Sequence, residues 1–336
     1  MKLRQFYQVF RKSLDLKRRA RAAFEEGTCI CESCGHAVPL AGLEPLTILA
    51  CPKCGGNGLV PHRLNGYLLY EPLGAGGMSS VYKAVRRDTL EEMRLYAVKL
   101  LRRDRAVDEA VRREFLDEAD IHRAVSSHPN IVTFIECAQS GDEFFHVMDY
   151  VPGHSVKHRV EEAGRIPETL ALRWLQETAD ALRHIRDHGY LYRDISPGNL
   201  LTRQDDAICL IDFGLALPLD RADAANPDQP LVGTPEFMPP ERIQRLGEDE
   251  RSSIYSLGLL LFYMLKGENL IKADSHEKAA IQHVSSVRVA FNARMLPADC
   301  SPGVVALIAR MIKYDPVDRP ASLEELQQAL AGLAAS

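Results

Sequence analysis

Short runs of β-branched and aromatic residues fill the first half of the chain, and longer helical patterns follow them. Five of these runs predict strands: Tyr67 to Leu73, Val81 to Arg86, Arg94 to Leu101, Ile131 to Ala138 and Phe144 to Tyr150. Their lengths and the polar residues between them favour one antiparallel sheet. A charged, periodic segment from Asp108 to Val125 interrupts the runs and predicts a single helix packed on that sheet.

Beyond Pro152 the hydrophobic period changes from two residues to nearly four, which predicts helices. The clearest helical segments are Pro167 to His188, Ser252 to Lys266, Pro302 to Ile312 and Ser322 to Leu330. Pro302 stands at a favourable first helical position after Ser301, and Ser322 with Glu325 has the spacing of a capping box. The pattern therefore predicts a β-rich lobe at about 65–151 and a helical lobe at about 152–331.

The first 62 residues differ from both lobes. Residues 1–26 place apolar side chains among many basic ones and predict a basic amphipathic helix; the apolar residues are Phe6, Val9, Phe10, Leu14 and Leu16. This helix either packs on its neighbour with a solvated cationic face or binds a membrane surface or a partner. Residues 27–62 lose regular periodicity and are rich in Cys, Gly and Pro, so we place the first domain boundary near residue 62.

Composition narrows the class of protein only moderately. The chain has 336 residues, 46% of them hydrophobic and 26% charged, as in ordinary globular proteins. The longest apolar run, Ile254 to Leu265, is too short for a membrane span, and the N-terminus has no secretory apolar stretch. We therefore expect a cytoplasmic protein. A net charge of −5 disfavours a surface devoted to nucleic acid, although one basic segment could still bind it.

Five of the eight cysteines lie between Cys29 and Cys54. Cys31 and Cys34, then Cys51 and Cys54, form two CxxC pairs 16 residues apart, each followed by a glycine that lets the backbone curl around an ion. This spacing predicts a zinc ribbon with a closed, structural Zn²⁺ site. Reduced cysteines without metal and an iron site of the same geometry are the alternatives. Cys29 and His36 are further donors nearby.

A glycine-rich segment from Leu73 to Val81 lies between two predicted strands, where backbone amides can approach phosphate oxygens. Such a loop alone is weak evidence. Here Lys99 follows on the third strand and Glu118 on the next helix. A buried lysine that binds the α and β phosphates needs a carboxylate to hold it, and this pair has the right order and distance. Separately, each residue could be an ordinary surface charge.

Further motifs follow in order. They are Tyr192-Arg193-Asp194-Ile195-Ser196-Pro197-Gly198-Asn199, Ile211-Asp212-Phe213-Gly214, Gly233-Thr234-Pro235-Glu236, Pro240-Glu241, Tyr255-Ser256-Leu257-Gly258 and Asp315 to Pro320. With the earlier segments they make residues 65–331 resemble the protein kinase family, in particular bacterial serine/threonine kinases. The resemblance implies an α+β, bilobal fold, with an antiparallel N-lobe sheet plus one helix and a helical C-lobe, preceded here by the small zinc ribbon.

The resemblance also implies roles for residues. Asp194 would orient a substrate hydroxyl and accept its proton, and Asn199 and Asp212 would hold Mg²⁺ (or Mn²⁺) on the phosphates of ATP. Glu241 and Arg319 would form a buried ion pair. The implied ATP site consists of Leu73, Gly74, Ala75, Gly76, Gly77, Met78, Ser79, Ser80, Val81, Ala97, Lys99, Met148, Asp149, Val151 and Leu201, of which Val81, Ala97 and Leu201 would sandwich adenine.

Four positions depart from the family pattern. Ser196 replaces the catalytic-loop lysine, and losing one preorganised donor of this kind costs on the order of 10²–10³ in rate. Ser79 stands at the third loop glycine. Ser253 stands where an aspartate of the following helix usually braces the catalytic loop. His122 occupies a usually apolar position one turn after Glu118.

The segment from Asp212 to Gly233 contains no Ser, Thr or Tyr, so a regulatory phosphate has no acceptor there. Arg193 nevertheless keeps the charge that such a phosphate would bind. We hypothesise that Asp220, Asp223 or Asp228 is a permanent acidic partner of this arginine. A mobile solvated loop is the alternative.

The sequence thus predicts an ATP-dependent serine/threonine protein kinase that phosphorylates protein hydroxyls. The alternative is a catalytically weakened, nucleotide-binding pseudokinase that acts as a scaffold or allosteric partner, as Ser196 and Ser253 suggest. A kinase-fold enzyme acting on a small molecule is disfavoured by the peptide-docking segment at Gly233 to Glu241. A further alternative is that the main function lies in the zinc ribbon and the basic helix, which would bind a protein or a nucleic acid. The substrate, trigger and oligomeric state are not encoded in any pattern we recognise.

Overall fold

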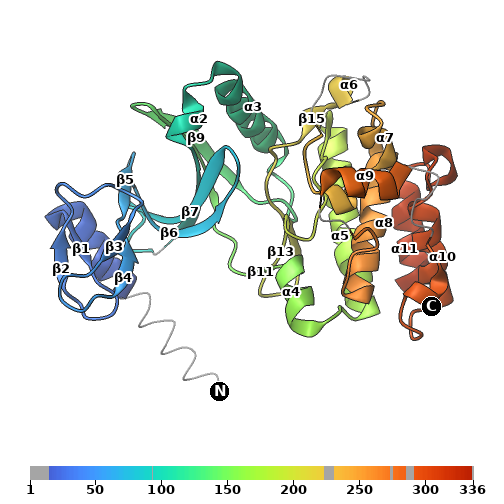
Figure 1. Ribbon diagram of the computed structural model, residues 1–336, viewed down its shortest axis with the longest axis horizontal. Coiled ribbons are helices and arrows are strands. Elements are labelled where there is room, and N and C mark those ends of the chain that lie inside the picture. The colour runs from blue at the N-terminus through green and yellow to red at the C-terminus, as the bar shows by residue number, and fades with distance from the viewer. Residues whose placement is uncertain (1–14, 93, 223–230, 273–274, 285–290, 335–336) are drawn as a thin grey trace. The chain divides into compact units, whose positions relative to one another are not determined.

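The computed structural model describes residues 15–92, 94–222, 231–272, 275–284 and 291–334 (Figure 1). The chain divides into two compact units. The first comprises residues 1–116 and 134–150, and the second comprises residues 117–133 and 151–336. Among the described residues, no helix combines the length and the apolar character needed to cross a bilayer.

The first unit begins with a helix and two small hairpins. Residues 15–21 are α-helical and continue into a π-turn, η1 (Ala22–Glu26), which ends at Gly27 in the left-handed region. Strands β1 (Thr28–Ile30) and β2 (Ala37–Pro39) form one antiparallel hairpin, and β3 (Ile48–Ala50) and β4 (Asn57–Leu59) form the other. The predicted basic helix therefore extends to residue 26 as expected, while its residues 1–14 lie outside the described residues.

A six-stranded antiparallel sheet forms the rest of the first unit, in the order β5-β6-β7-β8-β10-β9 (Figure 1). Its strands are β5 (His62–Leu64), β6 (Tyr67–Ala75), β7 (Ser79–Arg86), β8 (Leu95–Leu101), β9 (Phe134–Ser140) and β10 (Glu143–Asp149). All five predicted runs contribute a strand, and β5 is an additional edge strand. The run predicted from Ile131 joins the sheet only at Phe134, because the amide of Val132 and the bridge at Ile131 pair instead with Leu210 of the second unit.

Alternating side chains give the sheet two apolar faces. Tyr67, Leu69, Val98 and Phe145 belong to the larger cluster, on one face. The opposite face carries Leu68 and Val85, which pack against Ala20 and Ala23 of the N-terminal helix and η1. The apolar side chains in the described part of that helix are therefore used for packing on the sheet.

Helix α3 (Glu109–Val125) is the single helix predicted between the strands, and a short helix, α2 (Arg103–Ala106), precedes it. The Phe115 side chain of α3 is fully buried and its ring lies 3.9 Å from that of His146 on β10. This contact packs the first half of α3 on the sheet, as the sequence predicts.

The second unit is mainly helical. Its longer helices are α4 (Val156–Ala163), α5 (Glu168–Asp187), α8 (Glu250–Lys266), α9 (His276–Val284), α10 (Pro302–Met311) and α11 (Leu323–Ala334). Two shorter ones are α6 (Leu219–Ala222) and α7 (Pro240–Ile243), and the 3-10 turns are η2 (Pro235–Phe237), η3 (Ala293–Met295) and η4 (Pro316–Asp318). The Ser301 hydroxyl accepts the Val304 amide at 3.4 Å, so α10 has the predicted cap. All four predicted helices are present.

Small sheets in the second unit hold the loops that carry the motifs. Strands β11 (His154–Ser155), β13 (Leu200–Thr202) and β14 (Ile208–Leu210) form one sheet, and β12 (Tyr190–Leu191) pairs with β15 (Leu217–Pro218). The loop between β12 and β13 and the segment between β14 and β15 therefore leave the same group of short strands. A curled antiparallel lobe and a helical lobe, preceded by a four-cysteine module, confirm the predicted fold class.

Candidate active site and metal centre

The predicted catalytic base, Asp194, lies on the loop between β12 and β13, and both of its carboxylate oxygens accept hydrogen bonds. The Asn199 amide donates to Oδ2 at 2.7 Å and to the main-chain carbonyl of Asp194 at 3.1 Å. The hydroxyl and the main-chain amide of Thr234 donate to Oδ1 at 3.0 and 3.3 Å. Three of these four bonds go to the carboxylate, from residues 5 and 40 positions along the chain, and hold it in one orientation.

The two predicted magnesium ligands come from adjacent backbone. The Ile211 amide donates to the Asn199 carbonyl at 3.0 Å, which places Asp212 next to the catalytic loop. Asp212 has a φ of +68°, a left-handed conformation that non-glycine residues rarely adopt. Its Oδ1 accepts the amide of Gly214 at 3.2 Å, a local turn typical of aspartate. Two hard oxygen donors are thereby brought to one place.

An aromatic stack supports this motif from inside the second unit. The Phe213 ring is buried, with its centroid 5.5 Å from that of Tyr192 and 4.6 Å from the parallel imidazole of His122. His122 is polar where an apolar residue was expected, and its Nε2 lies 2.7 Å from the Val132 carbonyl oxygen, which satisfies the buried ring. Burial raises the pKa of the Tyr192 hydroxyl well above its usual value, and that hydroxyl donates to the Ile211 carbonyl at 2.8 Å.

Arg193 has an acidic partner that the hypothesis did not name. Its guanidinium is buried and pairs with Glu248, at 2.8 and 2.6 Å. Asp220 is exposed on α6 and accepts the amide of its neighbour Arg221, while Asp223 and Asp228 lie outside the described residues. A carboxylate from the segment before α8, and not Asp220, therefore neutralises Arg193.

The glycine-rich loop is the turn between β6 and β7. The Gly76 amide donates to the Ser79 carbonyl at 2.8 Å, and Ala75 pairs with Ser80 across the hairpin. Neither Gly74 nor Gly77 has a positive φ, and a Cβ added at either would meet no protein atom within 4 Å. Neither backbone conformation nor protein packing requires glycine there, so the open space along the hairpin is available to a ligand.

Lys99 and Glu118 are both nearly inaccessible, at 6% and 5% exposure. Lys99 lies in the middle of β8, between Val81 of β7 and His146 of β10. Glu118 lies in the half of α3 that belongs to the second unit. Burial of both charges fits the predicted pair, and the pair itself remains a prediction.

The predicted adenine residues are distributed over four strands and a connecting segment. Ala97 on β8 pairs with Met148 on β10, and Val81 on β7 follows the glycine-rich turn. Asp149 ends β10, and its side chain accepts the guanidinium of Arg94 at 2.8 Å. Leu201 on β13 and Val151 belong to the second unit. The structure thus places the first-unit residues side by side on neighbouring strands.

The predicted ion pair of the helical lobe is confirmed. Arg319 donates to both carboxylate oxygens of Glu241, at 2.8 and 3.0 Å, and both side chains are buried. Ser253 and Ser196 are buried as well, at 5% and 4% exposure, in α8 and in the catalytic loop. These two of the four positions that depart from the family pattern are therefore interior ones.

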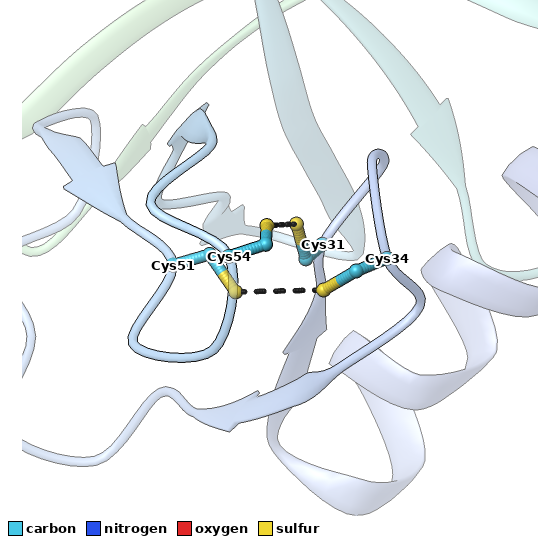
Figure 2. A group of neighbouring side chains, drawn as sticks. All are labelled: Cys31, Cys34, Cys51 and Cys54. Atoms are coloured by element: carbon cyan, nitrogen blue, oxygen red, sulfur yellow. Dashed lines mark hydrogen bonds between the residues drawn. The ribbon is translucent and has the colours of Figure 1, made fainter.

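The four predicted cysteines lie together at the tips of the two hairpins (Figure 2). Their sulfur atoms are all within 4.8 Å of one another, and Cys31 to Cys54 and Cys34 to Cys51 are 3.7 Å apart. In a tetrahedral site with metal–sulfur bonds of about 2.3 Å, the sulfurs lie about 3.8 Å apart. The arrangement therefore has the dimensions of an S₄ metal site, and neither Cys29 nor His36 belongs to this group.

The two cysteine turns have the same backbone. The Gly35 amide donates to the Cys31 carbonyl at 2.9 Å, and the Gly55 amide donates to the Cys51 carbonyl at 2.8 Å. The two glycines have φ values of +69° and +71°. Only a residue that tolerates this left-handed conformation closes such a turn without strain. The glycine after each CxxC thus has the structural role that the sequence predicts.

The thiols influence one another strongly. Main-chain amides of Cys34 and Ser33 lower the pKa of Cys31 to about 6. The Gly56 amide lowers the pKa of Cys54, but the thiols of Cys34 and Cys31 outweigh it and raise that pKa to about 12. Four thiolates this close repel one another, and a divalent cation among them would remove the repulsion.

Two residues near the catalytic loop, Arg242 and Glu248, were not singled out from the sequence. They lie 49 and 55 residues after Arg193 and follow no recognised motif spacing. The sequence offered one indication of them. Arg193 is retained although the activation segment has no phosphate acceptor, so a carboxylate is expected to pair with Arg193.

Comparison with known proteins identifies the fold. The protein kinase domain family matches residues 67–331. Serine/threonine-protein kinase PknB of Mycolicibacterium smegmatis is 32% identical over 271 residues, which are 79% of this chain and 42% of that protein. Serine/threonine-protein kinase pkn2 of Myxococcus xanthus is 30% identical over 79% of this chain and 32% of that protein. A probable serine/threonine-protein kinase of Clostridium perfringens is 30% identical over 78% of this chain and 37% of that protein. The chain spans less than half the length of these relatives. With four fifths of its length aligned to them and the catalytic motifs in order, the chain belongs to the protein kinase domain family.

Proposed function

We propose that this chain is an ATP-dependent serine/threonine protein kinase, which transfers the γ-phosphoryl group of ATP to hydroxyl groups of proteins. The observation that carries the proposal is the hydrogen-bonded Asp194 carboxylate, held by Asn199 and Thr234 within a kinase-family domain. A carboxylate fixed in this way can orient a hydroxyl and accept its proton. The similar proteins are named as serine/threonine-protein kinases, which supports the same activity.

The other predicted site residues would bind the metal ion and the phosphates of ATP. Magnesium-bound ATP supplies the phosphoryl group and its charge neutralisation. Asn199 and Asp212, both hard oxygen donors, would hold the magnesium or manganese ion. The open hairpin at Gly74 and Gly77 would admit the phosphates, and Lys99, held by Glu118, would bind them. Positioning of these groups, more than covalent chemistry, accelerates such a reaction.

The second candidate is a weakened, nucleotide-binding pseudokinase acting as a scaffold or allosteric partner. It is favoured by one observation, the uncharged Ser196 in place of the lysine that the family pattern leads us to expect. The hydroxyl of Thr234 at Asp194 Oδ1 supplies a hydrogen bond but no positive charge. The two candidate functions therefore differ in the rate of phosphoryl transfer that the site supports without a lysine at position 196.

Transfer of radiolabelled phosphate from ATP separates them. The natural chain is compared with Asp194→Asn, which keeps the shape of the side chain but removes the base. Asp205→Asn, in the exposed turn after β13, is the matched control. We expect transfer to protein substrates that persists in the control and is lost in Asp194→Asn. ATP binding without any transfer by the natural chain would favour the pseudokinase.

We also propose that Cys31, Cys34, Cys51 and Cys54 hold one structural Zn²⁺. The sulfur separations near 3.7 Å and the two matching turns support a closed four-thiolate site. Such a site leaves no position for water, so the metal would stabilise the module and take no part in phosphoryl transfer. Iron is the competing metal, and metal analysis with absorbance spectroscopy distinguishes it, since a Zn²⁺–thiolate site is colourless in the visible range and an iron–thiolate site is not.

The described part of the basic helix favours packing over nucleic-acid or membrane binding. Lys17 and Arg21 pair with Glu91, and Arg19 pairs with Glu32 at 2.6 Å, so these cations are matched within the first unit. A protein partner of the zinc ribbon therefore suits this surface better than a nucleic acid. Thiolates that bind metal must stay reduced, which agrees with the cytoplasmic location that we propose.

A further inference from the structure

A buried cluster of two arginines and one glutamate adjoins the catalytic loop, and no sequence motif accounts for it. Arg193, Arg242 and Glu248 have side-chain exposures of 6%, 7% and 3%. Each carboxylate oxygen of Glu248 serves one arginine. Oε1 accepts Nε and Nη2 of Arg193 at 2.8 and 2.6 Å, and Oε2 accepts Nε and Nη2 of Arg242 at 2.9 and 2.7 Å. Such paired bonds between a guanidinium and a carboxylate are among the strongest hydrogen bonds in proteins.

The cluster reaches the backbone beside the catalytic base. Nη1 of Arg242 donates to the main-chain carbonyl of Arg193 at 2.7 Å, and the next residue along the chain is Asp194. The main-chain amide of Glu248 donates to the carbonyl of Ala222 at 2.8 Å, at the end of α6 in the activation segment. Glu248 thus connects the catalytic loop, α7 and the activation segment through four side-chain bonds and one main-chain bond.

The negative charge of Glu248 neutralises two buried positive charges, those of Arg193 and Arg242. Without Glu248, two guanidinium groups would lie buried beside each other, and burial together with Arg242 already lowers the pKa of Arg193. A buried like-charge pair forces the side chains apart or into water. Because Arg242 holds the Arg193 carbonyl, such a displacement would shift the backbone that presents Asp194.

Among the residues that the structure describes, Glu248 is the acidic side chain that pairs with Arg193. The segment from Asp212 to Gly233 contains no Ser, Thr or Tyr that could carry a phosphate, and Ser253 offers α8 no carboxylate for bracing the loop. Glu248 and Arg242 are buried and hydrogen-bonded to the catalytic loop, where a phosphate or a bracing carboxylate would otherwise act.

We propose that Glu248 is a positioning residue for phosphoryl transfer: a built-in carboxylate that, with Arg242, holds Arg193 and the backbone of Asp194 in the reactive arrangement without a phosphate on the activation segment. The proposal rests on the proposed kinase function. It also deepens that function, because it makes the activity independent of activation-segment phosphorylation.

Glu248→Gln tests the charge with little change in shape. Glu250→Gln is the matched control, because Glu250 lies two residues later, at the start of α8, where it pairs with Arg186 and accepts the Leu323 amide, both outside the catalytic loop. We expect Glu248→Gln to lower kcat about 10–100-fold, the range for groups that orient a functional residue, with little change in KM for ATP. Glu250→Gln should leave kcat within about twofold of the natural chain, because its contacts with Arg186 and Leu323 lie outside the catalytic loop and a partly exposed ion pair contributes little. Equal kcat in the two variants would overturn the proposal.

Chemical rescue separates positioning from general stability. Glu248→Ala leaves a space between two guanidiniums, which sodium formate can fill as a small carboxylate. We expect formate, but not sodium chloride at the same ionic strength, to restore at least about a tenth of the kcat of the natural chain, since the formate carboxylate can re-form the charge-assisted bonds. A folded Glu248→Ala with no response to formate would count against the proposal. If this variant does not fold, Glu248→Asp replaces it, and its kcat should lie between those of the natural chain and Glu248→Gln; a value at or below that of Glu248→Gln would count against the proposal.

Two measurements complete the test. Phosphatase treatment of the natural chain should leave kcat unchanged, whereas a fall would contradict independence from phosphate. Hydrogen exchange of residues 192–199 needs no catalysis, so it remains informative if the natural chain transfers no phosphate and the proposed function fails. Faster exchange there in Glu248→Gln than in Glu250→Gln supports the brace, and equal exchange overturns it.

Discussion

Arg319 offers the sharpest test of what holds the helical lobe together, and the change to test is Arg319→Met. All five N–H groups of its guanidinium have acceptors. Two bonds go to Glu241, and the others go to the main-chain carbonyls of Lys313, Arg251 and Tyr314, at 2.7 to 2.9 Å. The guanidinium also lies 4.8 Å from the ring centroid of Tyr255. Methionine fills a similar volume but donates no hydrogen bond.

The expected loss of stability is large. Arg319→Met leaves Glu241 buried with the Ser252 hydroxyl, at 2.5 Å, as its remaining bonded partner in the part of the chain that the structure describes. Removing one member of a buried ion pair destabilises a protein by about 3–5 kcal/mol. This is a substantial fraction of the roughly 5–15 kcal/mol that keeps a domain folded. A domain of this size should therefore melt about 6–20 °C lower.

Thermal and denaturant unfolding, followed by circular dichroism, measure the effect. The matched control is Arg165→Met, because Arg165 makes the same two-bond contact with Asp299, at 2.9 and 2.8 Å, but on the exposed surface. We expect almost no change in the melting temperature of the control, because water screens that pair. In the double variant Arg319→Met with Glu241→Met, stability should partly recover, since no buried charge remains unpaired. A loss in Arg319→Met no larger than in the control would refute this reasoning.

Three further predictions concern zinc binding by the cysteines, the pH dependence of stability and the hydrogen bond from Thr234 to Asp194. Cys31→Ser should abolish the binding of one Zn²⁺ per chain, measured by metal analysis, whereas Cys29→Ser should retain it. Burial lowers the pKa of His283 from its usual 6.5 to about 4, so the neutral ring favours the folded state. The stability that it contributes is complete above pH 6.5 and declines toward pH 4, by up to about 3 kcal/mol, and this decline should be absent from unfolding curves of His283→Gln. Thr234→Val removes the hydroxyl bonded to Asp194 and should lower kcat about 10-fold or more with KM for ATP unchanged, while an unaltered kcat would show that the Thr234 amide suffices.

Local features were the most predictable part of this protein. Each CxxC with its glycine indicated both a turn and a donor pair, because the required left-handed conformation depends only on neighbouring residues. The motif around Asp194 and Asn199, five residues apart, likewise indicated two polar groups on one loop, and the structure joins them by a 2.7 Å hydrogen bond. Short-range geometry limits such pairs to few arrangements.

Residues whose partners are distant in sequence were less predictable. The basic face of the N-terminal helix was compatible with several partners, and in its described part the structure pairs Lys17 and Arg21 with Glu91, and Arg19 with Glu32. His122 stands at a usually apolar position, and a carbonyl oxygen from a loop ten residues later satisfies its ring. In both cases the side chain alone did not indicate which polar group would face it.

By itself, the sequence determined the fold class, the order of strands and helices, the four-cysteine group and the candidate residues of the active site. Periodicity and motif spacing act over a few residues to a few turns, and they are read directly from the chain. Only the tertiary structure decided that Glu248 pairs with Arg193 and Arg242, and that Ile131 and Val132 pair outside the predicted strand. Those choices depend on which distant groups become buried together, because a buried charge or backbone group needs a partner wherever the fold brings one within reach.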